Sequence, residues 1–245
     1  MQAMQAEAAY APSPGRRRGY WPAAAAVVVL LLAAGLPEMV TGRYLFVETV
    51  QFAAFAMVIP ALAVLGTPWT PRFARLPLRG AAAVAVVFIG VCLAWRLPPV
   101  LDALARHPVL QVPELLTLLL AGFALWLQLV GSPSSEVRLP RPQRAAVAAI
   151  PMWSVWIIAY VLGFANHAVV SGYDVSGSLG VVTDQEITAI VTWAISAACF
   201  IPVIAVTMLA WLHDSSGPGL VVAEEQRPAT GTLVVRGWGR APRTR

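Results

Sequence analysis

Long apolar stretches alternate with short polar segments along most of the chain. A helix needs roughly 20 apolar residues to cross about 30 Å of hydrocarbon, and the stretches are about 16 to 28 residues long. The pattern predicts six transmembrane helices, at about 20–36, 44–66, 80–95, 109–130, 145–165 and 185–212. We therefore expect an all-α protein, a polytopic membrane bundle.

The arginines predict the orientation of this bundle. All 17 basic residues are arginine, and with six spans only Arg43, Arg96 and Arg106 fall on one side of the membrane. Cytoplasmic segments are enriched in arginine and lysine, so the other side, with both termini, should be cytoplasmic. Its fourteen arginines are Arg16, Arg17, Arg18, Arg72, Arg75, Arg79, Arg138, Arg141, Arg144, Arg227, Arg236, Arg240, Arg243 and Arg245.

The composition is typical of a membrane protein and argues against one class of partner. Hydrophobic residues make up 58% of the chain and charged residues 12%, about half the charged fraction of soluble domains. The net charge of +5 is scattered through loops and tails, which argues against nucleic acid as a partner. The chain is rich in Ala, Gly, Pro and Arg, which is typical of a GC-rich bacterial genome. We expect a multi-pass protein of the bacterial plasma membrane, surrounded by lipid.

The same pattern divides the chain into three parts. Residues 1–19 are polar and proline-rich and should be a disordered cytoplasmic tail. Residues 20–213 should form the transmembrane domain. Residues 214–245, rich in Gly, Pro and Arg, should be a flexible cytoplasmic tail.

Polar side chains inside the apolar stretches are the candidate functional residues. In the predicted topology the second, fourth and sixth spans all begin at the extracytoplasmic face. Their opening turns carry Glu48, Gln51, Gln111, Glu114, Asp184 and Gln185. Two readings are open for these groups. They could be first-turn acids and caps wetted by headgroup water, or they could turn inward and pair, as buried ionisable groups in membranes usually do.

The two readings apply to different residues. Asp184 and Glu186 adjoin a polar loop, so we interpret them as first-turn acids. Glu48 and Glu114 lie well inside apolar segments, each with an amide three residues before or after it on the same helix face. We therefore predict that the acids and amides of the three opening turns form a polar pocket open to the extracytoplasmic face. Its residues are Glu48, Gln51, Gln111, Glu114, Asp184 and Gln185.

The sequence gives less support for metal binding or catalysis than for a polar pocket. His107, His167 and Met39 fall on the extracytoplasmic side and are candidate ligands for copper or another soft cation. No HxxxH, HxH or MxxM spacing groups them, and a single loop histidine is more typical of a protein surface. The spans contain no histidine that could hold haem, and no nucleophile or nucleotide-binding motif is present. We expect a protein that is not an enzyme.

Three motifs resemble those of the CtaG-type cytochrome c oxidase assembly factors. They are ETVQFAAFAMVIPALAVLGTP, RHPVLQVPELLTLLLAGFALW and TDQEITAIVTW, in the family's order and across about 44–212. The positions that match are Gln51, Pro60, Gly66, Pro68, His107, Pro108, Glu114, Gly122, Trp126, Asp184, Gln185 and Trp193. The resemblance implies a factor that helps to deliver copper to a respiratory-chain oxidase at the outer membrane face, with oxidase subunits as partners.

The chain departs from the family pattern at the positions that resemble metal ligands. Glu48 and Phe52 stand where the first motif has histidines, and Gln111 and Leu115 stand where the second has them. Carboxylates would favour a hard cation such as Mg²⁺ or Ca²⁺ over Cu(I), or they could form a purely structural hydrogen-bond network. Copper is the cofactor that the resemblance implies, but the imidazoles that would bind it are missing.

Three functions follow from these observations. The first is an assembly factor that holds an oxidase subunit at the outer face. The second is a structural or accessory subunit of a membrane complex, in which the polar groups only join helices. The third is a small transporter, which the sequence favours least because the inner halves of the spans carry few polar groups beyond Gln128 and Thr192.

Overall fold

The computed structural model describes residues 22, 25–30, 44–66, 76–130, 139–170, 172–173 and 180–215. All regular elements within these ranges are helical. Five helices are long and apolar enough to cross a membrane, and they are Leu45–Gly66, Leu78–Trp95, Pro108–Leu129, Arg141–Gly163 and Val181–Ser215. The prediction of an all-helical protein with membrane-spanning helices is confirmed.

The five helices agree with five of the predicted spans, with ends that differ by at most four residues. The predicted first span, 20–36, is described only at residue 22 and residues 25–30, which are helical. The number of six spans and the cytoplasmic position of the termini therefore stay predictions. The tail 1–19 lies outside the described residues, as does the chain after Ser215, where the last helix ends.

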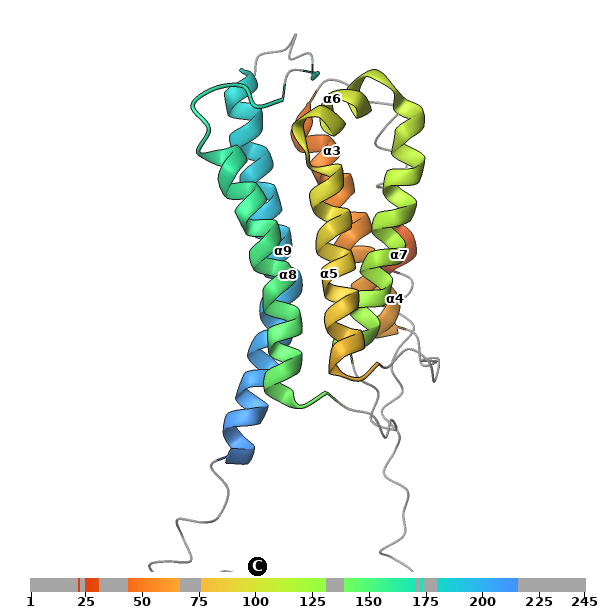
Figure 1. Cartoon of the computed structure of the whole chain (residues 1–245), viewed down its shortest axis with the longest axis vertical. Helices are drawn as coiled ribbons and strands as arrows, with labels where there is room; N and C mark the ends of the chain where they lie inside the picture. The colour runs from red at the N-terminus through yellow and green to blue at the C-terminus, as the bar shows by residue number, and fades with distance from the viewer. Residues whose placement is uncertain are drawn as a thin grey trace, which may run out of the picture.

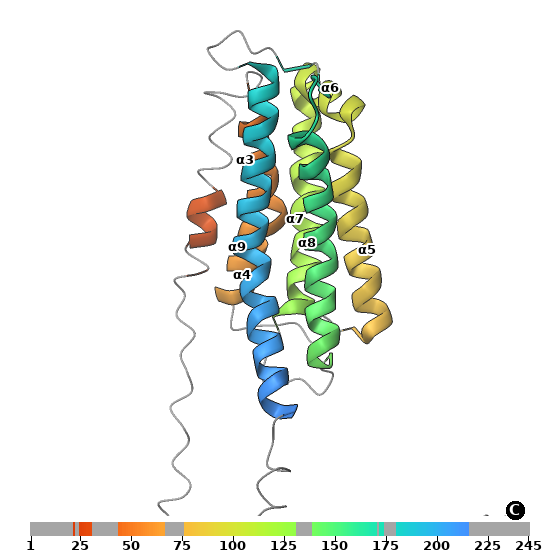
Figure 2. The same ribbon diagram turned by 90° about the vertical axis from the view of Figure 1, so that its left-hand side faces the viewer.

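The helices form a bundle in which one long antiparallel pair packs beside the remaining helices (Figures 1 and 2). This pair, α8 and α9, contacts the others through α5 and α3, and α7 packs between α5 and α4. The elements are α3 (Leu45–Ala53), η2 (Ala54–Val58), α4 (Ile59–Gly66), α5 (Leu78–Trp95), α6 (Pro98–Arg106), η4 (Pro108–Leu110), α7 (Gln111–Leu129), α8 (Arg141–Gly163) and α9 (Val181–Ser215).

A proline and a glycine explain the irregular centre of the second predicted span. η2 is a π-helical turn between α3 and α4. Pro60 has no N–H to donate to the carbonyl of Ala56, four residues earlier, and a π turn accommodates such an interruption. The Ala56 carbonyl faces α7 at Gly122, where a Cβ atom would lie only 2.2 Å from its oxygen. A glycine is required for this close contact.

Aromatic side chains fill the middle of the bundle. Trp126 of α7 stacks on Phe200 of α9, with ring centroids 5.5 Å apart and planes 17° apart. Phe88 of α5 meets Phe200 edge to face at 6.5 Å. All three are buried, so this contact joins helices from both parts of the bundle.

The short helix α6 lies across one end of the bundle (Figure 1). The hydropathy pattern predicts no helix here, because nine residues are too few to span a membrane. Leu101 and Leu104 on its apolar face are buried with Leu45, Val170 and Tyr173 in a second, smaller core. In the predicted topology this end of the bundle is extracytoplasmic, and we call it the outer end.

Candidate functional site

The predicted polar residues lie at the outer end of the bundle, and most of them are buried. Glu48, Gln51, Glu114, Asp184 and Gln185 are at most 4% exposed, although they come from three helices, α3, α7 and α9. Gln111, in the first turn of α7, is partly exposed. The five buried residues are enclosed by other side chains, and an open pocket at this end stays a prediction.

Glu48 is paired with an arginine that directly follows α5. The guanidinium of Arg96 donates from Nη1 to Oε2 of Glu48 at 2.6 Å and from Nη2 to Oε1 at 3.3 Å. Nη1 also donates to Oγ1 of Thr49 at 3.1 Å, and the guanidinium carbon lies 3.9 Å from the centroid of the Phe52 ring. A two-pronged ion pair of this kind is strong and directional. It joins the end of α5 to α3.

Glu114 of α7 lies beside this ion pair. Its carboxyl group interacts electrostatically with both Glu48 and Arg96. Its Oε1 atom is buried and has no hydrogen-bond partner among the described residues. A second buried carboxyl group therefore lies close to the ion pair of Glu48 and Arg96.

Asp184 of α9 caps a different helix, α3. Its Oδ2 accepts from the N–H of Leu45 at 2.7 Å, and its Oδ1 accepts from the N–H of Phe46 at 3.1 Å. The first N–H groups of a helix have no partner within the helix and carry partial positive charge. We interpreted Asp184 as a wetted first-turn acid of its own helix; it is instead buried against the start of α3. Glu186, interpreted in the same way, is exposed.

Gln185 holds the connection between α8 and α9 against the bundle. Its Oε1 accepts from the N–H of Val169 at 2.7 Å and of Val170 at 3.3 Å, and its Nε2 donates to the carbonyl of His167 at 3.1 Å. The carboxylate of Asp102 in α6 adds a second tie.

Asp102 joins the same connection to α6. Its Oδ1 accepts from the N–H of Gly172 at 2.6 Å. A Cβ atom at Gly172 would lie 2.9 Å from the Cα atom of Asp102, so the two segments pack backbone to backbone. Together, α6 with residues 167–170 and 172–173 forms the outer cover of the bundle.

Tyr173 of the outer cover lies over the polar residues. It interacts electrostatically with Glu48, Arg96, Glu114 and Asp184. Burial, and then the negative charge of Glu48, raise the pKa of Tyr173 above its usual range. The hydroxyl therefore stays neutral beside these charged groups. We call Glu48, Gln51, Arg96, Glu114, Asp184 and Gln185 the outer polar cluster.

A stripe of hydroxyl groups continues along α9 below the outer polar cluster. Thr188, Thr192 and Ser196 follow Asp184 at intervals of four residues and are all buried. Ser196 accepts a hydrogen bond from Nε1 of Trp156 at 2.8 Å, while the hydroxyls of Thr192 and Ser196 donate to carbonyls of their own helix. These hydroxyl groups join α8 to α9 through Ser196, which lies one helical turn before Phe200 of the aromatic core.

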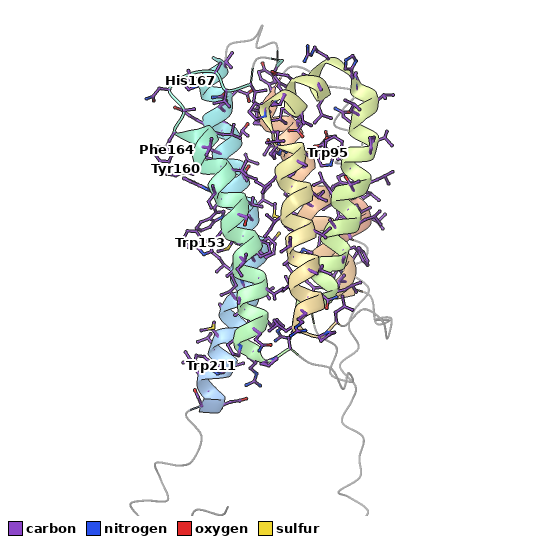
Figure 3. All side chains as sticks on the ribbon, in the orientation of Figure 1. Trp95, Trp153, Tyr160, Phe164, His167 and Trp211 are labelled. Atoms are coloured by element: carbon purple, nitrogen blue, oxygen red, sulfur yellow. The ribbon has the colours of Figure 1, made fainter. Side chains whose placement is uncertain are left out.

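The candidate metal ligands do not join the outer polar cluster. His107 and His167 are exposed, and Figure 3 shows His167 on the connection between α8 and α9. Met39 lies outside the described residues. Within the part of the chain that the structure describes, no three His, Cys, Asp or Glu side chains are grouped to hold a metal ion. His107 instead helps to line a surface hollow with its neighbours from Arg106 to Leu110.

Sequence reasoning did not identify Arg96, Asp102 or Tyr173 as part of the site. A signal for Arg96 was present, because an arginine at the outer end of a span opposes the usual distribution of basic residues and therefore calls for a partner. Asp102 and Tyr173 lie in segments that carry no periodic pattern long enough to place them. Their positions depend on α6, which the sequence did not predict.

The geometry of the site is suited to holding helices and loops in position. It contains no nucleophile paired with a base among the described residues, and its charged groups are enclosed. The ion pair ties α5 to α3, and Asp184 ties α9 to α3. Gln185 ties the outer cover to α9, and Asp102 joins the two segments of the outer cover to each other. Each tie fixes the shape of the outer end.

Comparisons with known proteins identify the family. No curated protein and no solved structure matches the chain. The family model for the cytochrome c oxidase caa3 assembly factor (Caa3_CtaG) matches residues 2–214, which include the outer polar cluster and the five spanning helices except for Ser215, the last residue of the fifth. The chain therefore belongs to the cytochrome c oxidase caa3 assembly factor family.

Proposed function

We propose that the protein assists assembly of a caa3-type cytochrome c oxidase by holding an oxidase subunit at the extracytoplasmic face of the bacterial plasma membrane. Membership of the assembly factor family supports the oxidase as partner. The buried pair of Glu48 and Arg96, which anchors the end next to the outer cover, is the observation that supports a holding role. In this role the protein is a scaffold and not an enzyme.

The docking surface follows from what the outer polar cluster holds in place. Arg96 positions the turn that leads into α6, and Gln185 and Asp102 position residues 167–170 and 172 against it. His107 and His167 are both exposed, and His107 lines the hollow that extends from Arg106 to Leu110. A rigid surface loses little conformational entropy on binding. We assign this outer face to the oxidase subunit.

Copper delivery, which the family resemblance implies, fits the residues of the outer polar cluster poorly. Cu(I) prefers thiolate, thioether and imidazole ligands, whereas the cluster consists of carboxylates, amides and a guanidinium. The guanidinium of Arg96 already supplies the positive charge beside Glu48. We therefore derive no step of the function through a metal at this cluster.

Deletion of the gene, followed by measurement of assembled oxidase in membranes, tests the proposal. We expect the deletion to lower assembled oxidase, and added copper to leave that defect in place. Recovery of the deletion strain by copper alone would contradict the holding role. Complementation with Val109→Glu, which alters the exposed hollow and none of the buried ties, should reduce binding of the oxidase subunit while the protein still accumulates.

The second candidate function is that of a permanent accessory subunit. It is favoured because Asp184 and Gln185 form hydrogen bonds with backbone groups of the protein's own fold. Affinity purification at successive times after induction of the oxidase separates the two functions. An assembly factor copurifies with incomplete oxidase and is released from the finished enzyme. A constant ratio to the finished oxidase would instead identify an accessory subunit.

A further inference from the structure

The half of the bundle opposite the outer polar cluster contains an apolar groove. Its volume is about 510 Å³, within the range of roughly 300–1,000 Å³ that is typical of ligand sites. Leu62 and Leu65 of α4 line one wall, and Cys199, Val203 and Val206 of α9 line the other. Trp126 and the end of α7 form the floor.

One charged residue lines this groove. Arg144 lies in the first turn of α8, which begins at Arg141. The same level of the bundle holds the ends of α4 at Gly66 and α7 at Leu129. In the predicted topology this level is the cytoplasmic membrane surface, where phospholipid phosphates lie. The groove thus extends from a cation at the headgroup level toward apolar walls in the membrane.

Apolar walls with a cation at one end match a specific class of ligand. An acyl chain makes van der Waals contacts with such walls, and basic sites between helices on the cytoplasmic side bind anionic headgroups. A zwitterionic lipid would fill the same walls but would gain less from Arg144. Complementary charge therefore distinguishes anionic lipid from the bulk lipid around the bundle.

We propose that this groove is a binding site for an anionic phospholipid, with one acyl chain between α4 and α9 and the phosphate at Arg144. The site lies apart from the outer cover, so it adds to the proposed function without depending on it. The bound lipid fills the space between the two parts of the bundle and joins α4 to α9 in the inner half.

Native mass spectrometry of the purified full chain tests the proposal, with phosphatidylglycerol or phosphatidylcholine added to the detergent micelles. We expect retained phosphatidylglycerol and little retained phosphatidylcholine. Arg144→Gln should weaken retention of phosphatidylglycerol about fivefold, because one arginine contributes about 1 kcal/mol to binding of anionic lipid. Arg141→Gln is the matched control, since Arg141 is bound to Asp214 and does not line the groove. Equal retention of both lipids would overturn the proposal.

A second pair of variants tests the walls. Val206 lines the groove and Leu209 does not, although both lie on α9 and are 66% exposed. Val206→Trp should fill the groove and displace phosphatidylglycerol, and Leu209→Trp should leave retention unchanged. The same retention in both variants would show that the lipid binds elsewhere.

The native cysteines report what occupies the groove. Cys199 lines it, whereas Cys92 is fully buried in α5. Phosphatidylglycerol should slow the reaction of Cys199 with N-ethylmaleimide, relative to phosphatidylcholine. Cys199 that is protected equally in both lipids would contradict a lipid site and indicate that protein, either this chain or a second copy, covers the groove.

Discussion

Each end of the bundle contains an ion pair, and the two pairs differ in how far their side chains are exposed. At the outer end the side chains of Arg96 and Glu48 are 4% and 6% exposed. At the inner end the side chains of Arg141 and Asp214 are 39% and 63% exposed. Water and ions screen the second pair but not the first. The outer end is therefore held by an ion pair enclosed within the protein, while the ion pair of the inner end is exposed.

This difference suggests what each end does. Buried ion pairs are poor sources of net stability but specify a single arrangement, which suits a surface that must present a fixed shape to a partner. The inner end contains the apolar groove instead, which suits lipid. Substitutions should therefore affect the two ends very differently.

The largest effect is expected where one partner of the outer ion pair is removed. Glu48→Ala should lower the free energy of unfolding by about 3–5 kcal/mol, because it removes the carboxylate that contacts the buried guanidinium of Arg96 and leaves only the neighbouring Glu114. Unfolding in mixed detergent micelles, followed by circular dichroism, measures this change. The double variant Glu48→Leu with Arg96→Met should recover most of the loss. A double variant as unstable as the single one would contradict a purely structural pair.

The contact between Gly122 and the Ala56 carbonyl should give the next largest effect. Gly122→Ala places a Cβ atom 2.2 Å from that oxygen, so the backbones of η2 and α7 must separate, at a loss of about 1–3 kcal/mol. Gly90→Ala is the matched control, because no atom lies within 4 Å of a Cβ at that position. Thermal midpoints that fall equally for both variants would show that the close packing is not required.

Removal of the cap on α3 should have an intermediate effect. Asp184→Ala should destabilise the protein by about 0.5–2 kcal/mol, the usual loss for a missing helix cap. Hydrogen exchange should rise at the amides of Leu45 and Phe46, which Asp184 holds. Glu186→Ala, which changes an exposed acid in the same turn, should alter neither stability nor exchange at these amides.

The smallest effect is expected at the inner ion pair. Asp214→Asn should change the free energy of unfolding by less than about 1 kcal/mol, because exposed pairs contribute little. High salt should remove the small stabilisation that Asp214 contributes, whereas it should leave the stabilisation by Glu48 unchanged. A large, salt-resistant loss in Asp214→Asn would remove the contrast between the two ends.

The sequence predicts the spanning helices well because their signal is local. About 20 consecutive apolar residues identify a span whatever its neighbours are, and Glu48 and Glu114 stand out because acids are rare inside such stretches. η2 was not predicted, since it depends on Pro60 together with the approach of Gly122 from another helix. α6 was not predicted because it is too short for the hydropathy pattern.

The partners within the site were harder to predict because they are distant in sequence. Arg96 lies 48 residues from Glu48, and Asp184 lies 139 residues from the amide of Leu45 that it binds. Spacing within one helix gives no information on such contacts. The topology places all of these residues at one end of the bundle, but only the structure shows which side chains meet.

The most direct test of the account measures assembled oxidase in membranes of cells that carry Glu48→Leu with Arg96→Met, at limiting copper. This double variant retains the packing of the outer end but has neither a carboxylate at position 48 nor a guanidinium at position 96. We predict oxidase levels close to those of the wild type, because apolar side chains can replace a buried ion pair while Asp184, Gln185 and Asp102 still hold the outer surface. A stable double variant that assembles as little oxidase as the deletion strain, and that recovers with added copper, would contradict it.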